Sequence, residues 1–346
     1  MKALLLTKYR SLEIADLPVP LPGPDEVLIR VAACGICGSD VHGYDGSSGR
    51  RIPPLVMGHE AAGVVASLGA EVKNVFEGDR VTFDSTIYCG ACAYCARGEV
   101  NLCDNRQVLG VSCGDYRRAG AFAEFVLVPA RIVYRLPDSL SFEEAAMLEA
   151  VSVAIHAVSL IPIAPDSSAL VFGAGTIGLL ALQALRAAGC SRVFISDVDP
   201  TRLKLAQELG ATATFPAGPE LKQHVSQMTN GDGVDIAMEA VGINTTVTAA
   251  IDSVRKGGNV VLVGNVTPEI TLPLQKVVTR QIRLQGSCAS AGEYPRAIEL
   301  VSSGAIRVRP LITAIAPLED GPQWFERLYA REPNLMKVVL APGTAS

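Results

Sequence analysis

The sequence predicts an α/β protein of two domains, in which a β-rich domain is followed by a doubly wound parallel sheet. Three observations support this prediction: the chain length, a change of rhythm near residue 150, and a glycine-rich turn at 173–178 between an expected strand and an expected helix. At about 150 residues per domain, a chain of 346 residues forms two domains with large cores. The hydrophobic content of 49% excludes a disordered chain.

Residues 1–150 consist of short β-rich runs separated by Pro, Gly and Asp turns. This texture is typical of an irregular β domain. The strands expected here are 27–33, 61–67, 80–83 and 122–128.

Residues 151–288 alternate between strand and helix, which predicts a parallel sheet covered by helices on both faces. The expected strands are 169–172, 192–196, 234–239 and 259–263, and the expected helices include 177–188 and 200–209. The apolar stretch 169–185 contains three glycines and falls short of the roughly 20 residues of a membrane span. From residue 289 the alternation loosens, and we expect 289–346 to return to the first domain.

Four cysteines in the segment 89–103 have the spacing C-x2-C-x2-C-x7-C: Cys89, Cys92, Cys95 and Cys103. Four thiolates fill every position of one tetrahedral zinc, so such a site stabilises a loop and leaves no position for substrate. Cysteines that fill a core fit poorly here, because turn formers and polar residues surround them. An iron-sulfur cluster and a pair of disulfides are further alternatives, and both are less favoured.

The charge and the cysteine content of the chain predict the class of its partners and its cellular compartment. The net charge of −5 comes without a Lys/Arg block, so we expect a small-molecule partner and no nucleic acid. The N-terminal apolar run is too short for a signal peptide. Nine cysteines without an export signal point to the reducing cytoplasm, and no membrane partner is expected.

A glycine-rich turn stands between an expected strand and an expected helix. It reads Gly173-Ala174-Gly175-Thr176-Ile177-Gly178, the pattern G-x-G-x-x-G of a Rossmann dinucleotide site. The glycines allow a tight turn, close approach of a pyrophosphate and contact between helix and strand. Asp197 follows Gly178 by 19 residues and is placed to accept the ribose hydroxyls, which favours NAD. Arg202 nearby keeps NADP open.

A second group of candidate metal ligands lies upstream. The segment GICGSDVHGY supplies Cys37, Ser39 and His42, and MGHEAAG supplies His59 and Glu60. One thiolate, one imidazole and one carboxylate suit a zinc that keeps an open position. Glu149, in MLEAVSVAIHA, is a further candidate. Such a zinc would lower the pKa of an alcohol, and a nicotinamide would accept the hydride.

The motifs GICGSDVH, GHEAAGVV, the four-cysteine lobe, GAFAEF and GAGTIG stand in one order. This order resembles the zinc-containing medium-chain alcohol dehydrogenases, and within them the polyol branch of sorbitol, xylitol and galactitol-phosphate dehydrogenases. The resemblance implies a GroES-like catalytic domain, a Rossmann domain, two zincs per chain and a homodimer or homotetramer. It implies that Cys37 and His59 bind the catalytic zinc, with Glu60 and Glu149 as carboxylates that bind it directly or through water. It also implies that Ser39 takes the substrate proton and His42 passes it on.

Two departures from the family pattern bear on the substrate. The polyol branch often has Glu-Pro where this chain has Glu149-Ala150. Arg117-Arg118 would suit a phosphate or carboxylate, although two solvated turn residues are the commoner case. Tyr44 and Ser112 are further candidates for the substrate pocket.

The sequence thus predicts a zinc-dependent enzyme that oxidises a secondary alcohol of a polyol, with or without a phosphate, to a ketose. Simple alcohols, butanediol or L-threonine are alternative substrates on the same scaffold. A zinc-stabilised NAD-binding regulator without turnover is the alternative from another class.

Overall fold

The structure is a computed structural model that describes residues 1–343. The chain forms two compact units. Unit 1 contains Met1–Glu149, Tyr294–Ser302 and the described part of Val308–Ser346, and unit 2 contains Ala150–Glu293 and Ser303–Arg307. The expected boundary after residue 150 therefore lies next to this division, whereas the boundary expected after residue 288 falls five residues earlier than the one found.

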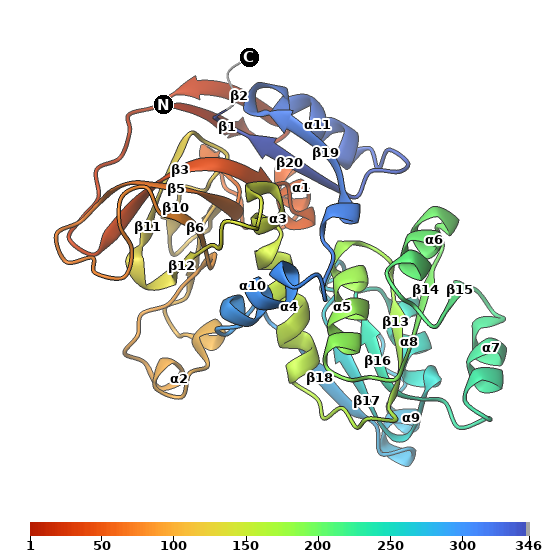
Figure 1. The fold of residues 1–346 in the computed structure, drawn as a ribbon. Coiled ribbons are helices and arrows are strands. Elements are labelled where there is room, and N and C mark those ends of the chain that lie inside the picture. The colour runs from red at the N-terminus through yellow and green to blue at the C-terminus, as the bar shows by residue number, and fades with distance from the viewer. Residues whose placement is uncertain (344–346) are drawn as a thin grey trace. The chain divides into compact units, whose positions relative to one another are not determined.

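Unit 1 is built on a mixed sheet in the order β12-β6-β5-β3-β20-β19, with β11 also paired to β3 (Figure 1). Its strands are β1 Lys2–Lys8, β2 Ser11–Asp16, β3 Glu26–Gly35, β4 Leu55–Val56, β5 Glu60–Leu68, β6 Arg80–Phe83, β7 Thr86–Ile87, β8 Gln107–Val108, β9 Val111–Ser112, β10 Arg117–Arg118, β11 Phe125–Pro129, β12 Val133–Arg135, β19 Ile312–Pro317 and β20 Lys337–Ala341. Its helices are α1 Gly38–Tyr44, α2 Ala93–Ala96, α3 Phe142–Ala145, the start of α4 Leu148–Ser159, α10 Tyr294–Ser302 and α11 Gly321–Tyr329.

The C-terminal segment belongs to the core of unit 1. Strand β20 lies between β3 and β19, so a strand from the C-terminal part of the chain is built into the sheet that contains β3. Phe325 of α11 is fully buried and packs against Phe122 and Tyr44. This packing accounts for the break in the strand-helix rhythm after unit 2.

Unit 2 is a parallel sheet of six strands in the order β15-β14-β13-β16-β17-β18. Its strands are β13 Ser168–Phe172, β14 Arg192–Asp197, β15 Ala213–Pro216, β16 Val234–Glu239, β17 Val254–Leu262 and β18 Arg283–Gly286. Its helices are the rest of α4, α5 Thr176–Ala187, α6 Pro200–Glu208, α7 Leu221–Met228, α8 Asn244–Ser253 and α9 Leu274–Thr279.

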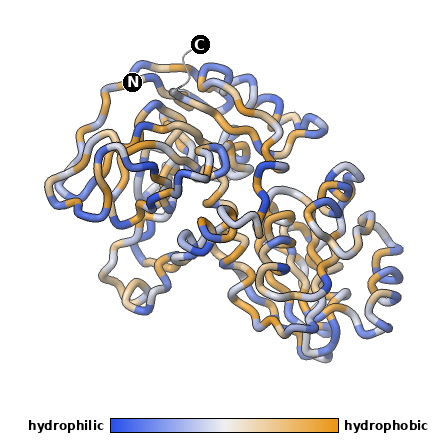
Figure 2. Tube along the Cα trace, viewed as in Figure 1, coloured by the Kyte–Doolittle hydropathy of each residue, from blue (hydrophilic) through white to orange (hydrophobic). Residues whose placement is uncertain are grey.

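Helices cover both faces of this sheet. Leu170 and Phe172 of β13 share a core with residues of α8, among them Ile251. Val171 points to the opposite face because side chains alternate along a strand, and there it contacts the start of α5 beneath Gly178. Figure 2 shows that hydrophobic residues gather inside this unit and that hydrophilic residues lie along its rim. The predicted doubly wound α/β domain is confirmed.

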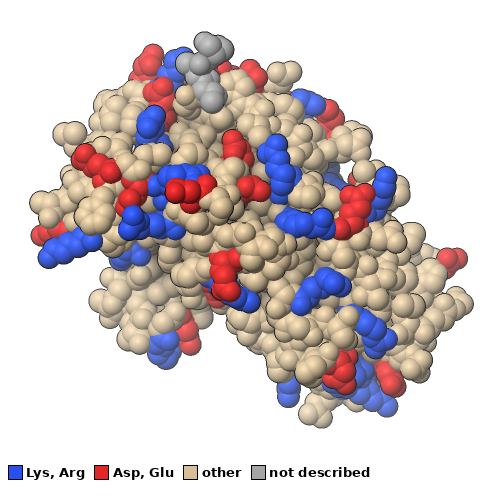
Figure 3. All heavy atoms as spheres, in the orientation of Figure 1, with Lys and Arg blue, Asp and Glu red and all other residues tan. Residues whose placement is uncertain are grey.

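The surface carries no dominant charge on the face drawn in Figure 3, where Lys and Arg alternate with Asp and Glu. Among residues 1–343, no helix is long and apolar enough to cross a membrane.

Candidate metal centres and cofactor site

Four cysteines converge at the loop around α2. The Sγ atoms of Cys92 and Cys95 are 3.5 Å apart, those of Cys89 and Cys95 are 4.0 Å apart, and all four Sγ atoms, with Cys103, lie within 4.8 Å of one another. A tetrahedral zinc with Zn–S bonds of about 2.3 Å requires sulfur atoms about 3.8 Å apart. The four cysteines therefore fit a closed zinc site, whereas a disulfide would need a separation of about 2.05 Å.

Backbone N–H groups in this lobe lower the pKa of two of the four cysteines. The pKa of Cys89 is lowered to about 6, chiefly because the Ala91 N–H donates to its sulfur. The pKa of Cys92 is lowered as well, chiefly by the N–H of Cys95. Burial raises the pKa of Cys95 to about 12. These lowered pKa values favour the thiolate, which is the form that binds zinc.

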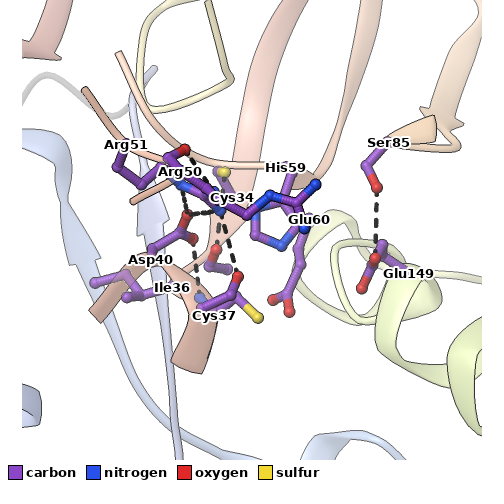
Figure 4. A network of polar contacts seen from close by, with 12 residues as sticks. Cys34, Ile36, Cys37, Asp40, Arg50, Arg51, His59, Glu60, Ser85 and Glu149 are labelled. Atoms are coloured by element: carbon purple, nitrogen blue, oxygen red, sulfur yellow. Dashed lines mark hydrogen bonds and ion pairs between the residues drawn. The ribbon is translucent and has the colours of Figure 1, made fainter. Parts of the chain in front are cut away.

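A second group in unit 1 brings together a thiol, an imidazole and a carboxylate. The ligand atoms of Cys37, His59 and Glu60 lie within 4.8 Å of one another. Cys37 caps the N-terminus of α1, and Glu60 begins β5 directly after His59. Figure 4 shows the three side chains gathered, with Asp40 and Arg51 on one side. Mixed sulfur, nitrogen and oxygen ligands suit a zinc that keeps one position open.

The carboxylate of Glu60 is held by a buried lysine from the far end of the chain. Lys337, the first residue of β20, places its Nζ 2.5 Å from Glu60 Oε2 and donates to the Ile36 carbonyl at 3.2 Å. Burial opposes the charge of Lys337, but Glu60 outweighs it and raises the pKa of the lysine. Gly35 makes room for the pair, because a Cβ there would lie 2.4 Å from Glu60 Oε2. Lys337 therefore occupies Oε2 of Glu60, and Oε1 is the carboxylate oxygen outside this ion pair.

The imidazole of His59 faces a fully buried carboxylate. Its Nδ1 lies 3.4 Å from Asp40 Oδ1, an ion-pair distance that is long for a hydrogen bond. Burial alone would lower the pKa of His59, but Asp40 outweighs it and raises the pKa. Burial likewise acts to raise the pKa of Asp40, but His59 and Arg51 outweigh it and lower that pKa to about 2. With Nδ1 turned to Asp40, Nε2 is the nitrogen left for a metal.

Glu149 lies outside both ligand groups found among the described residues. Its Oε1 accepts a hydrogen bond of 3.4 Å from Ser85 Oγ, and Figure 4 shows the two apart from the Cys37 group. Burial raises the pKa of Glu149 to about 7. Burial raises the pKa of Tyr294, and the charges of Asp84 and Glu149 raise it further. The Tyr294 hydroxyl has no hydrogen-bond partner within the described part of the chain.

The two residues expected to move the substrate proton lie on α1. Ser39 and His42 are both exposed, and their spacing of three residues places them on one face of the helix. The Ser39 hydroxyl accepts a contact of 3.4 Å from Arg51 Nη2. Both side chains can therefore exchange protons with solvent.

The glycine turn of unit 2 has the geometry that a pyrophosphate needs. Gly173 has φ +94°, and a Cβ on Gly178 would lie 1.7 Å from the Gly173 carbonyl oxygen. Gly175, the N-cap of α5, has open space where its Cβ would stand. Thr176 and Ile177 form the first turn of α5, whose free N–H groups face that space. The backbone at Gly173 and the close approach at Gly178 thus favour glycine at both positions.

Asp197 ends β14 next to this turn. Its Oδ2 accepts the Ala174 N–H at 2.5 Å and its Oδ1 accepts the Asp199 N–H at 2.8 Å. Each oxygen keeps a lone pair for a ribose hydroxyl. Arg202 pairs with Asp199 at 3.6 Å, so part of its charge is already balanced.

The candidate substrate residues bind other parts of unit 1. Arg117 donates to Ser112 Oγ and to the Pro54 carbonyl, and Arg118 donates to Gln107. Tyr44 is buried in the core and donates to the Arg10 carbonyl, so the expectation that it lines a substrate pocket is wrong.

Sequence analysis missed three residues that organise the surroundings of the Cys37 group: Asp40, Arg51 and Lys337. Arg51 and Lys337 reach the group from 14 and 300 residues beyond Cys37, and only the fold brings them there. Asp40 stands within the GICGSDVH segment, so its spacing from Cys37 on a short helix was the one usable signal.

Comparison with known proteins gives matches to both units. The alcohol dehydrogenase GroES-like domain matches residues 23–138, and the zinc-binding dehydrogenase family matches residues 176–303. Sorbitol dehydrogenase of Bacillus subtilis is 36% identical over 99% of this chain and 98% of its own length. L-Idonate 5-dehydrogenase of Vitis vinifera is 37% identical over 89% of this chain and 85% of its own length. A solved structure described as a zinc-binding dehydrogenase of Sinorhizobium meliloti bound to NADP has a TM-score of 0.90 and 33% identity, and covers 99% of both chains.

Proposed function

The chain belongs to the zinc-containing medium-chain alcohol dehydrogenases, and from this premise we propose that it oxidises a secondary alcohol of a polyol to a ketose. The observation that carries the proposal is the mixed group of Cys37, His59 and Glu60 in unit 1, together with the dinucleotide turn in unit 2. A non-catalytic binder has no use for a mixed, open ligand set in addition to a closed four-cysteine lobe.

Cys37 and His59 would hold the catalytic zinc, and Cys89, Cys92, Cys95 and Cys103 the structural one. Zinc at the Cys37 group would act as a Lewis acid that lowers the pKa of the substrate hydroxyl. Ser39 would accept the hydroxyl proton, and His42 on the same face of α1 would pass it to solvent. NAD⁺ in unit 2 would accept the hydride from the carbinol carbon.

Glu60 would serve as the third ligand through the oxygen that does not pair with Lys337. Glu149 would act through water, because it lies outside the group within 4.8 Å. Its pKa of about 7 suits a carboxyl that exchanges a proton near neutral pH.

NAD⁺ would be preferred to NADP⁺. The carboxylate of Asp197 at the end of β14 would repel a 2′-phosphate, and the partner of Arg202 is Asp199. A similar solved structure is bound to NADP. The proposed preference for NAD⁺ therefore rests on Asp197 of this chain and not on the family as a whole.

The substrate class follows the relatives, since sorbitol is a polyol and L-idonate is a polyhydroxy acid. A panel of polyols, polyol phosphates, sugar acids, simple alcohols, butanediol and L-threonine tests this, with zinc-loaded protein, NAD⁺ and NADH absorbance as the readout. Turnover of one polyol supports the proposal, and preference for a phosphorylated polyol would turn attention to Arg117 and Arg118. Turnover of simple alcohols alone, or none with two zincs bound, would contradict the substrate class.

We also propose a homo-oligomer joined through the β18 edge of unit 2. Strand β18 pairs only with β17 among the described strands, so its outer edge is available to a second copy. Leu274 and Val278 of the adjacent α9 are 62% and 67% exposed, and Val266 lies in the preceding loop with 53% exposed. All nine cysteines are free thiols, which supports the cytoplasm as the compartment.

A further inference from the structure

Arg51 is a buried arginine beside the Cys37 group. It is 5% exposed, and its guanidinium contacts three partners in unit 1. Nη2 lies 3.1 Å and Nε 3.4 Å from Asp40 Oδ1, and Nη1 donates to the Arg50 carbonyl at 3.1 Å. A planar guanidinium held at several nitrogens has one orientation, so Arg51 fixes the position of the Asp40 carboxylate.

Asp40 in turn contacts both protein ligands nearest to it. Its Oδ2 accepts the backbone N–H of Cys37 at 3.2 Å, and its Oδ1 faces His59 Nδ1 at 3.4 Å. The Asp40 carboxylate therefore fixes the position of the Cys37 backbone and the orientation of the His59 ring. Because Asp40 is 0% exposed, it needs a permanent counter-charge, and Arg51 provides it.

The same guanidinium reaches the proton acceptor of the proposed reaction. Arg51 Nη2 contacts Ser39 Oγ at 3.4 Å. An arginine only donates hydrogen bonds, so the Ser39 oxygen is the acceptor and its own proton turns to another partner.

Helix α1 is shaped to receive this arginine. A Cβ on Gly43 would lie 2.1 Å from Arg51 Cγ and 2.9 Å from its Cβ. Gly43 is buried within the seven-residue helix, where glycine is a poor helix former. The glycine leaves space that the stem of Arg51 fills.

We propose that Arg51 is a positioning residue for the catalytic metal site: through Asp40 it holds Cys37 and His59 in one geometry, and it orients the Ser39 hydroxyl. This inference rests on the proposed function. Arg51 touches neither substrate nor cofactor in this account, and its effect passes through the residues that do.

The experiment compares Arg51→Gln, Arg51→Lys and Gly43→Ala with wild type. Arg135→Gln is the matched control, because it breaks an Arg–Asp pair of 3.0 Å on the surface of the same unit. The readouts are the affinity for the second zinc by chelator competition, the visible spectrum of protein with Co²⁺ at that site, and kcat and KM separately. The zinc of the four-cysteine lobe serves as an internal reference for folding.

Loss of a group that orients metal ligands costs about 10–100-fold in metal affinity or activity, and Arg51→Gln is expected in that range with a changed Co²⁺ spectrum. Arg51→Lys is expected to have a zinc affinity between those of Arg51→Gln and wild type. The lysine ammonium keeps the positive charge but lacks the planar guanidinium that donates from several nitrogens. Gly43→Ala is expected to weaken the second zinc as well, because its Cβ displaces Arg51. Arg135→Gln is expected to match wild type in every readout.

A folded Arg51→Gln variant with wild-type zinc affinity and spectrum overturns the inference. If Arg51→Gln does not fold, unchanged affinity and spectrum in both Arg51→Lys and Gly43→Ala overturn it instead. Wild-type protein that binds only the lobe zinc would contradict the proposed function itself, and so the two failures are distinguishable.

Discussion

Lys337 and Glu60 form a buried ion pair whose two residues are 277 positions apart. Loss of one partner from such a pair leaves an unpaired buried charge, which costs about 3–5 kcal/mol. Lys337→Met should therefore lower the free energy of unfolding of unit 1 by that amount. Urea unfolding followed by the fluorescence of Trp324, the single tryptophan, reports on this unit.

The control for this substitution is Lys2→Met, which removes an exposed pair with Glu319. Exposed pairs contribute little to stability because solvent screens their charges. Equal losses of stability in the two variants would show that Lys337 is not the counter-ion that unit 1 requires.

The proposed preference for NAD⁺ depends on one side chain, that of Asp197. Asp197→Asn keeps the acceptor for the Ala174 N–H but removes the negative charge. We expect kcat/KM with NADP⁺, relative to NAD⁺, to rise about ten-fold or more, since each 1.4 kcal/mol of relieved repulsion is a factor of ten. Asp232→Asn, an exposed acid before β16, should leave the ratio unchanged. An unchanged ratio in Asp197→Asn would refute this role.

At the level of single residues, the two groups of candidate metal ligands could be predicted because their residue types and spacing are encoded locally. Four cysteines within 89–103, and His59 next to Glu60, are unusual at such short spacing. Arg51 and Lys337 could not be predicted, since their roles depend on Gly43 and Gly35 leaving space for them. Charged residues are mostly exposed, so a buried one is predicted to lie on the surface unless its partner is known.

Two glycines at the start of helix α5, Gly175 and Gly178, have different surroundings. Gly178→Ala should destabilise unit 2 by about 1–3 kcal/mol or more, because its Cβ would overlap the Gly173 carbonyl. Gly175→Ala should fold as wild type but bind NADH more weakly, because its Cβ would fill the open space at the helix N-terminus. Thermal unfolding and NADH fluorescence titration measure the two effects. Wild-type NADH affinity in Gly175→Ala would contradict the placement of the pyrophosphate.

At the element scale, long periodic segments were predicted well and irregular ones were not. The helix expected at 177–188 is α5 Thr176–Ala187, and the strand expected at 234–239 is β16 Val234–Glu239. Strand β17 begins at Val254, five residues before the expected start, because Gly257 and Gly258 interrupt its apolar pattern. The strand expected at 122–128 begins only at Phe125.

The proposed homo-oligomer forms through the β18 edge of unit 2. Val278→Glu would place a charge on α9 beside that edge and should shift sedimentation towards the monomer. Met228→Glu is the control, because Met228 is an exposed apolar residue on α7, which packs against β15 at the opposite edge of the sheet. Equal effects of the two variants, or none from Val278→Glu, would argue against this interface.

The most direct test of the whole account compares Cys37→Ala with Cys103→Ala for zinc content, thermal stability and NADH formation on the preferred polyol. Wild type should contain two zincs, whereas Cys37→Ala should contain one zinc and have near-normal stability and no turnover. Cys103→Ala should lose stability, because a structural zinc contributes folding free energy. Turnover at the wild-type rate in Cys37→Ala, or the same phenotype in both variants, would contradict the division between a catalytic and a structural metal centre.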